Sequence, residues 1–140
     1  MIRTKVIHPN TREQYEAAII EAYEWALEEG GILIFNTVLA RKDAGKVIAA
    51  HRGRQQIEKD AKSGKLSIGV ARGQDYTLRG PRIAIFDGSD TDMKRIEAHF
   101  HDEWGEEGYS EIRSYTMTVD THKDWTRTYN PEIIDRSQNS

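Results

Sequence analysis

An unbroken apolar run from Ile32 to Phe35 is the sequence feature that most constrains how this chain folds. A strand with one solvated face alternates apolar and polar residues. A continuous run, which goes on to Val38-Leu39, therefore indicates a central strand covered on both faces. The run follows a helix over residues 12–29 whose apolar residues recur every three or four positions, and Gly30-Gly31 ends that helix. With a first strand at residues 2–7, the order predicts a parallel βαβ unit.

The rest of the chain supplies two more helical patterns and three more strand patterns. They are a basic helix at 42–62 interrupted at 52–54, strands at 66–70 and 82–86, a helix at 89–104, and a strand at 109–120. We predict the α+β class: a two-layer α/β sandwich with a mixed sheet and a ferredoxin-like core, in the order β-α-β-[basic α]-β-β-α-β, with a C-terminal arm. The predicted single domain covers 1–134, with an inserted basic helix at about 41–64, and 135–140 form a disordered tail.

The composition excludes several classes of protein. The 140 residues contain no cysteine, so neither a disulfide scaffold nor a thiolate metal site can form. No apolar run approaches the roughly 18 residues of a membrane span, and the first seven residues lack the layout of a signal peptide. We therefore expect a cytoplasmic protein without a membrane partner.

Positive charge is concentrated in the middle of the chain, between Arg41 and Arg82. This stretch holds 11 Lys and Arg residues against 4 Asp and Glu residues, a net charge of +7. The whole chain has 20 Lys and Arg against 23 Asp and Glu, so the remaining residues carry −10. Such a basic segment is typical of a surface that binds an anionic ligand.

The predicted anion contacts are one lysine and five arginines, and one tyrosine is predicted to stack on a base. Four of the arginines adjoin glycines, so backbone N–H groups can approach an anion beside each guanidinium group. Tyr76 falls in a loop with Gly and Pro residues, where an aromatic ring can stack. The predicted anion contacts are Lys46, Arg52, Arg54, Arg72, Arg79 and Arg82.

An alternative site lies around the start of the helix at 89–104. Carboxylates that follow a strand, next to a helix carrying histidines, can hold a divalent cation. The residues for this metal site are Asp87, Asp90, Asp92, His99 and His101. The carboxylates also have structural explanations, because they fall in a first helical turn and in an Asp-Gly turn. The isolated histidines His8 and His122 are expected to be exposed.

These patterns predict a binding protein rather than an enzyme. We expect it to recognise a phosphate-bearing ligand, either a nucleic acid or a nucleotide-type small molecule, through the basic 41–82 segment and without a cofactor. One alternative is a small divalent-metal-dependent hydrolase or nuclease that uses the 87–101 region. A second is a self-assembling interaction protein, a homo-oligomer that joins the acidic helix at 12–29 to the basic helix at 41–64. The small size is compatible with a viral or a cellular protein.

Overall fold

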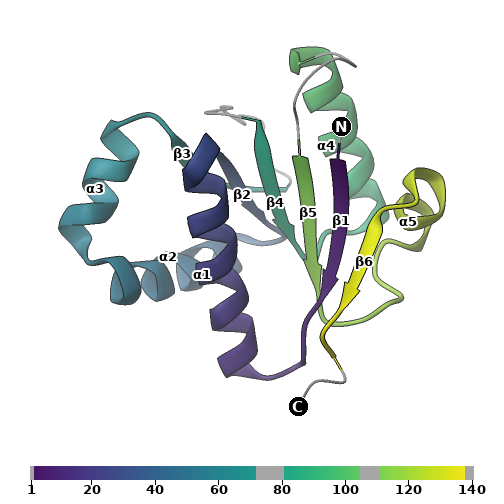
Figure 1. Ribbon diagram of the computed structural model, residues 1–140, viewed down its shortest axis with the longest axis horizontal. Helices are drawn as coiled ribbons and strands as arrows, with labels where there is room; N and C mark the ends of the chain where they lie inside the picture. Colours follow the sequence, from purple (N-terminus) through teal and green to yellow (C-terminus); the bar gives the residue numbers. More distant parts are fainter. Residues whose placement is uncertain (1, 72–80, 105–110, 138–140) are drawn as a thin grey trace.

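The computed structural model describes residues 2–71, 81–104 and 111–137, without the side chains of residues 100–104. Six strands form one sheet in the order β3-β2-β4-β5-β1-β6, and every neighbouring pair is parallel (Figure 1). The strands are β1 (Ile2–Ile7), β2 (Gly31–Phe35), β3 (Leu66–Val70), β4 (Arg82–Phe86), β5 (Glu111–Thr116) and β6 (Glu132–Asp135). The helices are α1 (Arg12–Glu29), α2 (Val38–Arg52), α3 (Arg54–Lys62), α4 (Asp90–Trp104) and α5 (Lys123–Tyr129).

The prediction of a mixed sheet in a two-layer, ferredoxin-like core is wrong. Ferredoxin-like cores have antiparallel strands, whereas every pair here is parallel and helices cover both faces, so the fold belongs to the α/β class. The prediction placed β3 and β4 in succession with no crossover between them. They instead lie on opposite sides of β2, and both run parallel to it.

Alternation along the central strands divides the core into two layers. Leu33 and Phe35 of β2 face the side covered by α1, α2 and α3, and join buried residues of those helices in one cluster. Ile32 and Ile34 face the other side, where Met93 of α4 and Trp125 of α5 complete a second cluster. Because both faces of β2 are covered, its five residues are all buried, as the continuous apolar run predicted.

Local sequence signals set most helix ends. Thr11 caps α1, and Thr37 caps α2 by accepting a hydrogen bond from the N–H of Ala40. The apolar pair Val38-Leu39, expected to prolong the strand, instead begins α2. Ser89 and Asp92 exchange hydrogen bonds as a capping box at the start of α4. Among the described residues, no helix has both the length and the apolar character needed to cross a membrane.

The two glycines between α1 and β2 have different roles. Gly30 has a φ of 88°, a left-handed value that favours glycine and lets the chain leave the helix. A Cβ atom at Gly31 would lie 1.9 Å from the carbonyl oxygen of Arg82, so β2 and β4 can approach only because no side chain is present there.

The C-terminal arm forms part of the sheet. Trp125 is buried within α5, and β6 then pairs in parallel with β1. The predicted strand at 109–120 ends earlier, at Thr116, and residues 117–122 lead into α5. The chain therefore crosses from β5 over β1 to reach the edge of the sheet.

An aromatic row spans the middle of the sheet on the α1 side. Phe35, Phe86 and Tyr115 occupy one register level of β2, β4 and β5. The ring centroids are 4.9 Å apart for Phe35 and Phe86 and 4.8 Å apart for Phe86 and Tyr115, with nearly parallel planes. All three side chains are buried, so the row joins three strands close to their carboxyl ends.

We expect Phe86→Ala to lower the free energy of unfolding by about 3–5 kcal/mol, because it opens a cavity in the centre of this row. Leu39→Ala is the control, since Leu39 is 78% exposed, and should change stability by less than about 0.5 kcal/mol. Urea unfolding followed by far-ultraviolet circular dichroism measures both, and equal losses would contradict a central role for the row.

Candidate functional site

The carboxyl ends of β2 and β4 form a topological switch point. The two strands are neighbours, but α2 follows β2 on one face of the sheet, whereas α4 follows β4 on the other (Figure 1). In open parallel sheets, ligands bind in the crevice where such connections diverge. Because Phe35 pairs with Phe86, Asn36 and Asp87 lie at the same level on either side of this point.

The two helices that begin at the switch point differ in charge. The first turn of α4 carries Asp90 and Asp92, which complement the positive end of the helix dipole. The first turn of α2 has no acidic residue. The exposed Arg41 and Lys42 are the fourth and fifth residues of this helix. An anion is therefore better accommodated at the start of α2 than at the start of α4.

A partly buried polar cluster adjoins the switch point, formed by the buried His8 and the half-buried Tyr15 and Asp87. His8 follows β1 and is only 2% exposed, so the prediction of an exposed histidine is wrong. Its ring centroid is 6.0 Å from that of Tyr15, whose ring also packs edge-on against Phe86. Burial raises the pKa of Tyr15 to about 12, and the nearby charge of Asp87 adds to the effect. The three side chains come from β1, α1 and β4, so the fold alone brings them together.

Asp87 reaches this cluster through an unusual backbone conformation. Ile85 faces α4 and Phe86 faces α1, so an extended residue 87 would place its side chain on the α4 side. Asp87 instead has a φ of 51°, and its carboxyl group interacts with His8 and Tyr15 on the α1 side. Burial raises the pKa of Asp87, while the charge of His8 and the N–H of Met117 oppose that rise. A half-buried carboxylate on a residue with left-handed backbone is a feature typical of functional sites.

The turn after Asp87 is held from the α4 side. A Cβ atom on Gly88 would lie 2.6 Å from Cδ1 of Ile85, so glycine lets this turn pack closely against that side chain. The carbonyl of Gly88 accepts a hydrogen bond of 2.9 Å from Nδ1 of His122. Nε2 of His122 then accepts from the Ser114 hydroxyl at 2.8 Å. His122 is 3% exposed, which corrects the prediction that it is exposed, and both ring nitrogens are satisfied.

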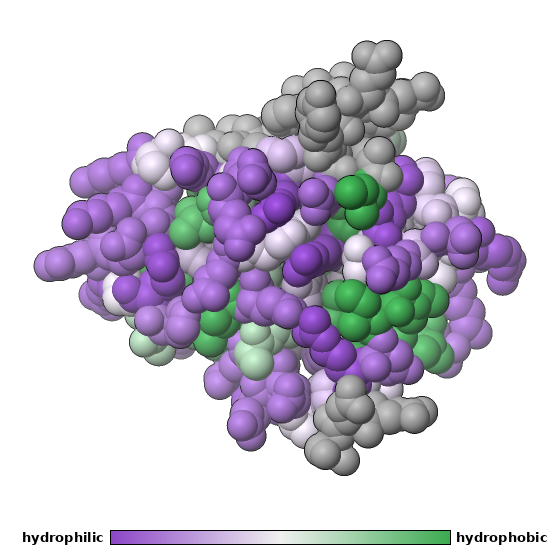
Figure 2. Space-filling model, in the orientation of Figure 1, coloured by the Kyte–Doolittle hydropathy of each residue, from purple (hydrophilic) through white to green (hydrophobic). Residues whose placement is uncertain are grey.

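The basic segment forms a surface that begins near the switch point with α2 and continues along α3 to the turn before β3. We define the cationic surface as the exposed basic side chains of α2, α3 and the turn before β3. They lie in the hydrophilic left side of the molecule in Figure 2. Within the described part of the chain, none of them makes an ion pair shorter than 4 Å. These residues are Arg41, Lys42, Lys46, Arg54, Lys59, Lys62 and Lys65.

Arg52, a predicted anion contact, is engaged inside the molecule. Its guanidinium group donates to the buried Asp60 at 3.0 Å, and Asp60 also accepts from the Tyr23 hydroxyl at 2.7 Å and from Gln56. Burial alone would raise the pKa of Asp60, but these hydrogen bonds outweigh it and lower the pKa. Arg52 therefore joins α2 and α3 to α1.

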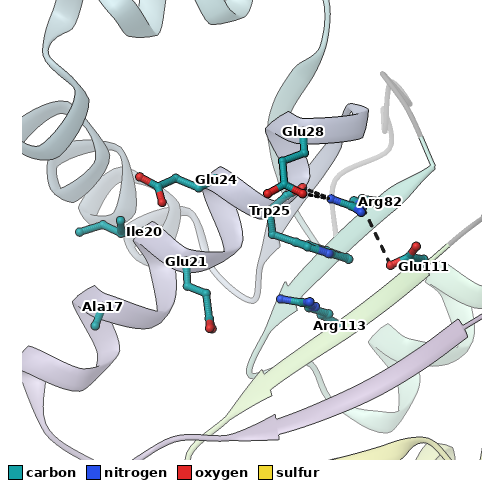
Figure 3. A pocket seen from close by; sticks show the side chains of 9 residues that line it. All are labelled: Ala17, Ile20, Glu21, Glu24, Trp25, Glu28, Arg82, Glu111 and Arg113. Carbon is teal, nitrogen blue, oxygen red and sulfur yellow. Dashed lines mark hydrogen bonds and ion pairs between the residues drawn. The ribbon is translucent and has the colours of Figure 1, made fainter.

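Arg82 lies in an open groove of about 710 Å³ between α1 and the amino ends of β4 and β5 (Figure 3). Its guanidinium group donates to the carbonyl of Trp25 and to Glu28, both at 2.7 Å. Trp25 lies between Arg82 and Arg113, whose guanidinium carbons are 5.1 Å and 4.3 Å from its ring centroids. The charge of Arg82 is thus already matched by Glu28 at the amino edge of the sheet.

The remaining predicted residues are dispersed or undescribed. Asp92 caps α4, Asp90 accepts a hydrogen bond from the N–H of Trp125, and His99 lies about 13 Å further along the helix than Asp90 at 1.5 Å per residue. Among the described residues, no three His, Asp or Glu side chains are grouped as metal ligands. The side chain of His101 and all of Arg72, Tyr76 and Arg79 lie outside the described residues.

Sequence reasoning missed the cluster of His8 and Tyr15 and the place of Asp87 within it. A lone histidine after a strand and an Asp-Gly pair are common turn features, so neither gives a distinctive pattern. Comparison with known proteins gives no further guidance: no family model matches the chain, and no curated protein matches it.

Two neighbouring arginines are expected to differ in their effect on stability. Arg52→Ala should lower the free energy of unfolding by about 1–3 kcal/mol, because the buried Asp60 loses charged hydrogen bonds. Arg54→Ala should change it by less than about 0.5 kcal/mol, since Arg54 is exposed. Chemical unfolding of both variants tests this, and a stable Arg52 variant would contradict the structural role.

The pH dependence of stability is expected to contain a contribution from His122. Burial lowers its pKa in the folded state, so below about pH 6.5 the unfolded chain binds a proton that the folded protein does not. The free energy of unfolding should therefore fall as the pH drops from 6.5 through the lowered pKa. His122→Gln should reduce this dependence between about pH 7.5 and 5, and unchanged slopes would refute the assignment.

Proposed function

We propose that this protein binds nucleic acid, without catalysis, through the cationic surface of α2 and α3. The observation that carries the proposal is that six exposed cations on two adjacent helices, with Lys65 in the turn that follows, have no ion-pair partner in the described part of the chain. Leaving such charges unpaired costs electrostatic self-repulsion, which phosphate groups relieve.

The shape of the surface favours an extended polyanion over a nucleotide. α2 has 15 residues and is therefore about 22 Å long, and α3 continues the basic surface after Gly53. The hollow between Arg52 and Lys59 is open and lined by polar side chains, so it gives no enclosed place for a single base. Several phosphates spread along a strand match several lysines spread along two helices.

Arg52 and Arg82 form ion pairs within the molecule, so we leave them out of the proposed nucleic-acid contacts. Both guanidinium groups already donate to carboxylates, so they contribute little to binding an added anion. The exposed Arg54 and Lys46, also predicted from the sequence, stay in the proposed set. Lys59 and Lys62 lie three residues apart on α3, which places their side chains on one face of that helix.

The proposal is tested by fluorescence anisotropy of a labelled single-stranded RNA and a labelled DNA duplex at rising potassium chloride concentration. We expect the affinity to fall steeply as salt rises. The slope of the logarithm of the association constant against the logarithm of the salt concentration should be about −0.7 to −0.9 for each phosphate contacted. The triple variant Arg54→Ala/Lys59→Ala/Lys62→Ala should reduce that slope by about 2 and weaken binding at low salt by roughly tenfold or more.

A charge-matched control separates the surface from net charge. Lys94→Ala/Arg95→Ala/Arg127→Ala removes three exposed cations from α4 and α5, on the other face of the sheet. It should bind as the wild type does. Equal losses in both triple variants, or no binding to either nucleic acid at low salt, would refute the proposal.

A further inference from the structure

A partly enclosed cleft of about 210 Å³ lies between α4 and α5, on the face of the sheet opposite to α1 (Figure 1). Asp90 and Lys94 of α4 line it, and their spacing of four residues places them on one side of that helix. Asp124 and Thr128 line it from α5 with the same spacing. The volume is below the roughly 300–1,000 Å³ of sites that hold drug-sized ligands, so the cleft fits a small metabolite.

Two aromatic rings, Trp125 and Tyr129, form the apolar wall of this cleft. The backbone N–H of Trp125 donates to Oδ1 of Asp90, and its Nε1–H donates to the buried Glu97, both at 3.0 Å. The Tyr129 ring centroid is 6.3 Å from that of Trp125, and the guanidinium carbon of Arg3 lies 4.1 Å from the Tyr129 centroid. Arg3 also binds Glu97 through two hydrogen bonds of 2.7 Å and 2.8 Å. These contacts hold the wall in place before a ligand binds, which lowers the entropic cost of binding.

The cleft also contains one positive and one negative side chain without a partner. Asp90 is engaged by the N–H of Trp125, and it lies in the first turn of α4, where the helix dipole balances its charge. Lys94 and Asp124 form no ion pair within 4 Å in the described part of the chain, either with each other or with another residue. Two opposite charges therefore line one small cleft without pairing.

These charges select a ligand that carries both signs. An amine without a carboxylate would place a second cation beside Lys94. A carboxylate without an amine would meet the negative charges of Asp90 and Asp124. A zwitterion supplies a partner to each unpaired charge and adds no net charge to the cleft.

We propose that the cleft between α4 and α5 binds a free α-amino acid with an apolar or aromatic side chain. Its carboxylate pairs with Lys94 of α4, and its ammonium group pairs with Asp124 of α5. Its side chain packs against Trp125 and Tyr129, and the hydroxyl group of Thr128 supplies a further hydrogen bond. No residue of the cationic surface lines the cleft, so this site is independent of the proposed nucleic-acid binding.

The test is isothermal titration calorimetry of the protein with L-phenylalanine and L-leucine, compared with 2-phenylethylamine, 3-phenylpropionate and glycine. Both apolar amino acids should bind. The amine and the carboxylate should each bind about tenfold more weakly or less, because one charge of the cleft stays unpaired. Glycine keeps both charges but has no side chain to pack on the rings, so it should also bind more weakly. Phenylalanine binding should be unchanged in the Arg54→Ala/Lys59→Ala/Lys62→Ala variant, which separates the cleft from the cationic surface.

Two exposed substitutions assign the two charges. Lys94→Ala should weaken phenylalanine binding by about tenfold or more without weakening that of 2-phenylethylamine, which has no carboxylate. Asp124→Asn should weaken phenylalanine binding to a similar extent without weakening that of 3-phenylpropionate, which has no ammonium group. Both residues are exposed, so neither variant should lower the melting temperature. Arg127→Ala and Glu132→Gln remove exposed charges of the same signs outside the cleft, and these matched controls should bind phenylalanine as the wild type does.

Several results would overturn the proposal. They are no binding of either apolar amino acid at millimolar concentration, glycine that binds as tightly as phenylalanine, or a Lys94→Ala variant with wild-type affinity for phenylalanine. An amine that binds as tightly as phenylalanine, and loses affinity only in Asp124→Asn, would identify a simple cation as the ligand and refute the amino-acid assignment.

Discussion

The stacking of Phe35, Phe86 and Tyr115 is the interaction on which the carboxyl edge depends. Each ring comes from a different parallel strand, and nearly parallel planes at 4.9 Å and 4.8 Å require one common register. A slip of one residue in β4 would move Phe86 to the α4 side and break both contacts. Because the row fixes the register, the residues just beyond it meet at one level. Tyr15 also packs on Phe86, so the same row orients the start of α1.

The turn after β4 determines where the side chain of Asp87 lies relative to this row. An extended Asp87 would continue the alternation toward α4, but its left-handed backbone turns the carboxyl group to the other side of the sheet. The strain is retained because the surroundings fix the turn: Gly88 fits closely against Ile85, and His122 holds the Gly88 carbonyl. Two buried histidines thus differ in kind, since His122 is fully satisfied whereas Nε2 of His8 has no described partner.

The elements of this fold could be predicted from the sequence, but their order in the sheet could not. Periodicity gave β1, α1, β3 and β4 at nearly the residues where they occur, because each pattern reflects local burial. The alternation of Leu66, Ile68 and Val70 reflects the face of β3 that packs on the α1-side cluster, and it carries no information on strand direction. Strand order depends on which helix crosses which face, a long-range packing property. The cluster of His8 with Asp87 was missed for the same reason, since 79 positions separate two residues that only the sheet brings together.

The charge segregation seen in the sequence has two separate consequences in the folded protein. Part of it is used within the molecule, where Glu28 of acidic α1 pairs with Arg82 and Glu24 contacts His51 of α2. The rest of the positive charge, on outward positions such as Arg54 and Lys62, has no counterpart in the described chain. Internal pairing accounts for charged residues between the elements but not for the outer surface, which therefore keeps a net positive potential.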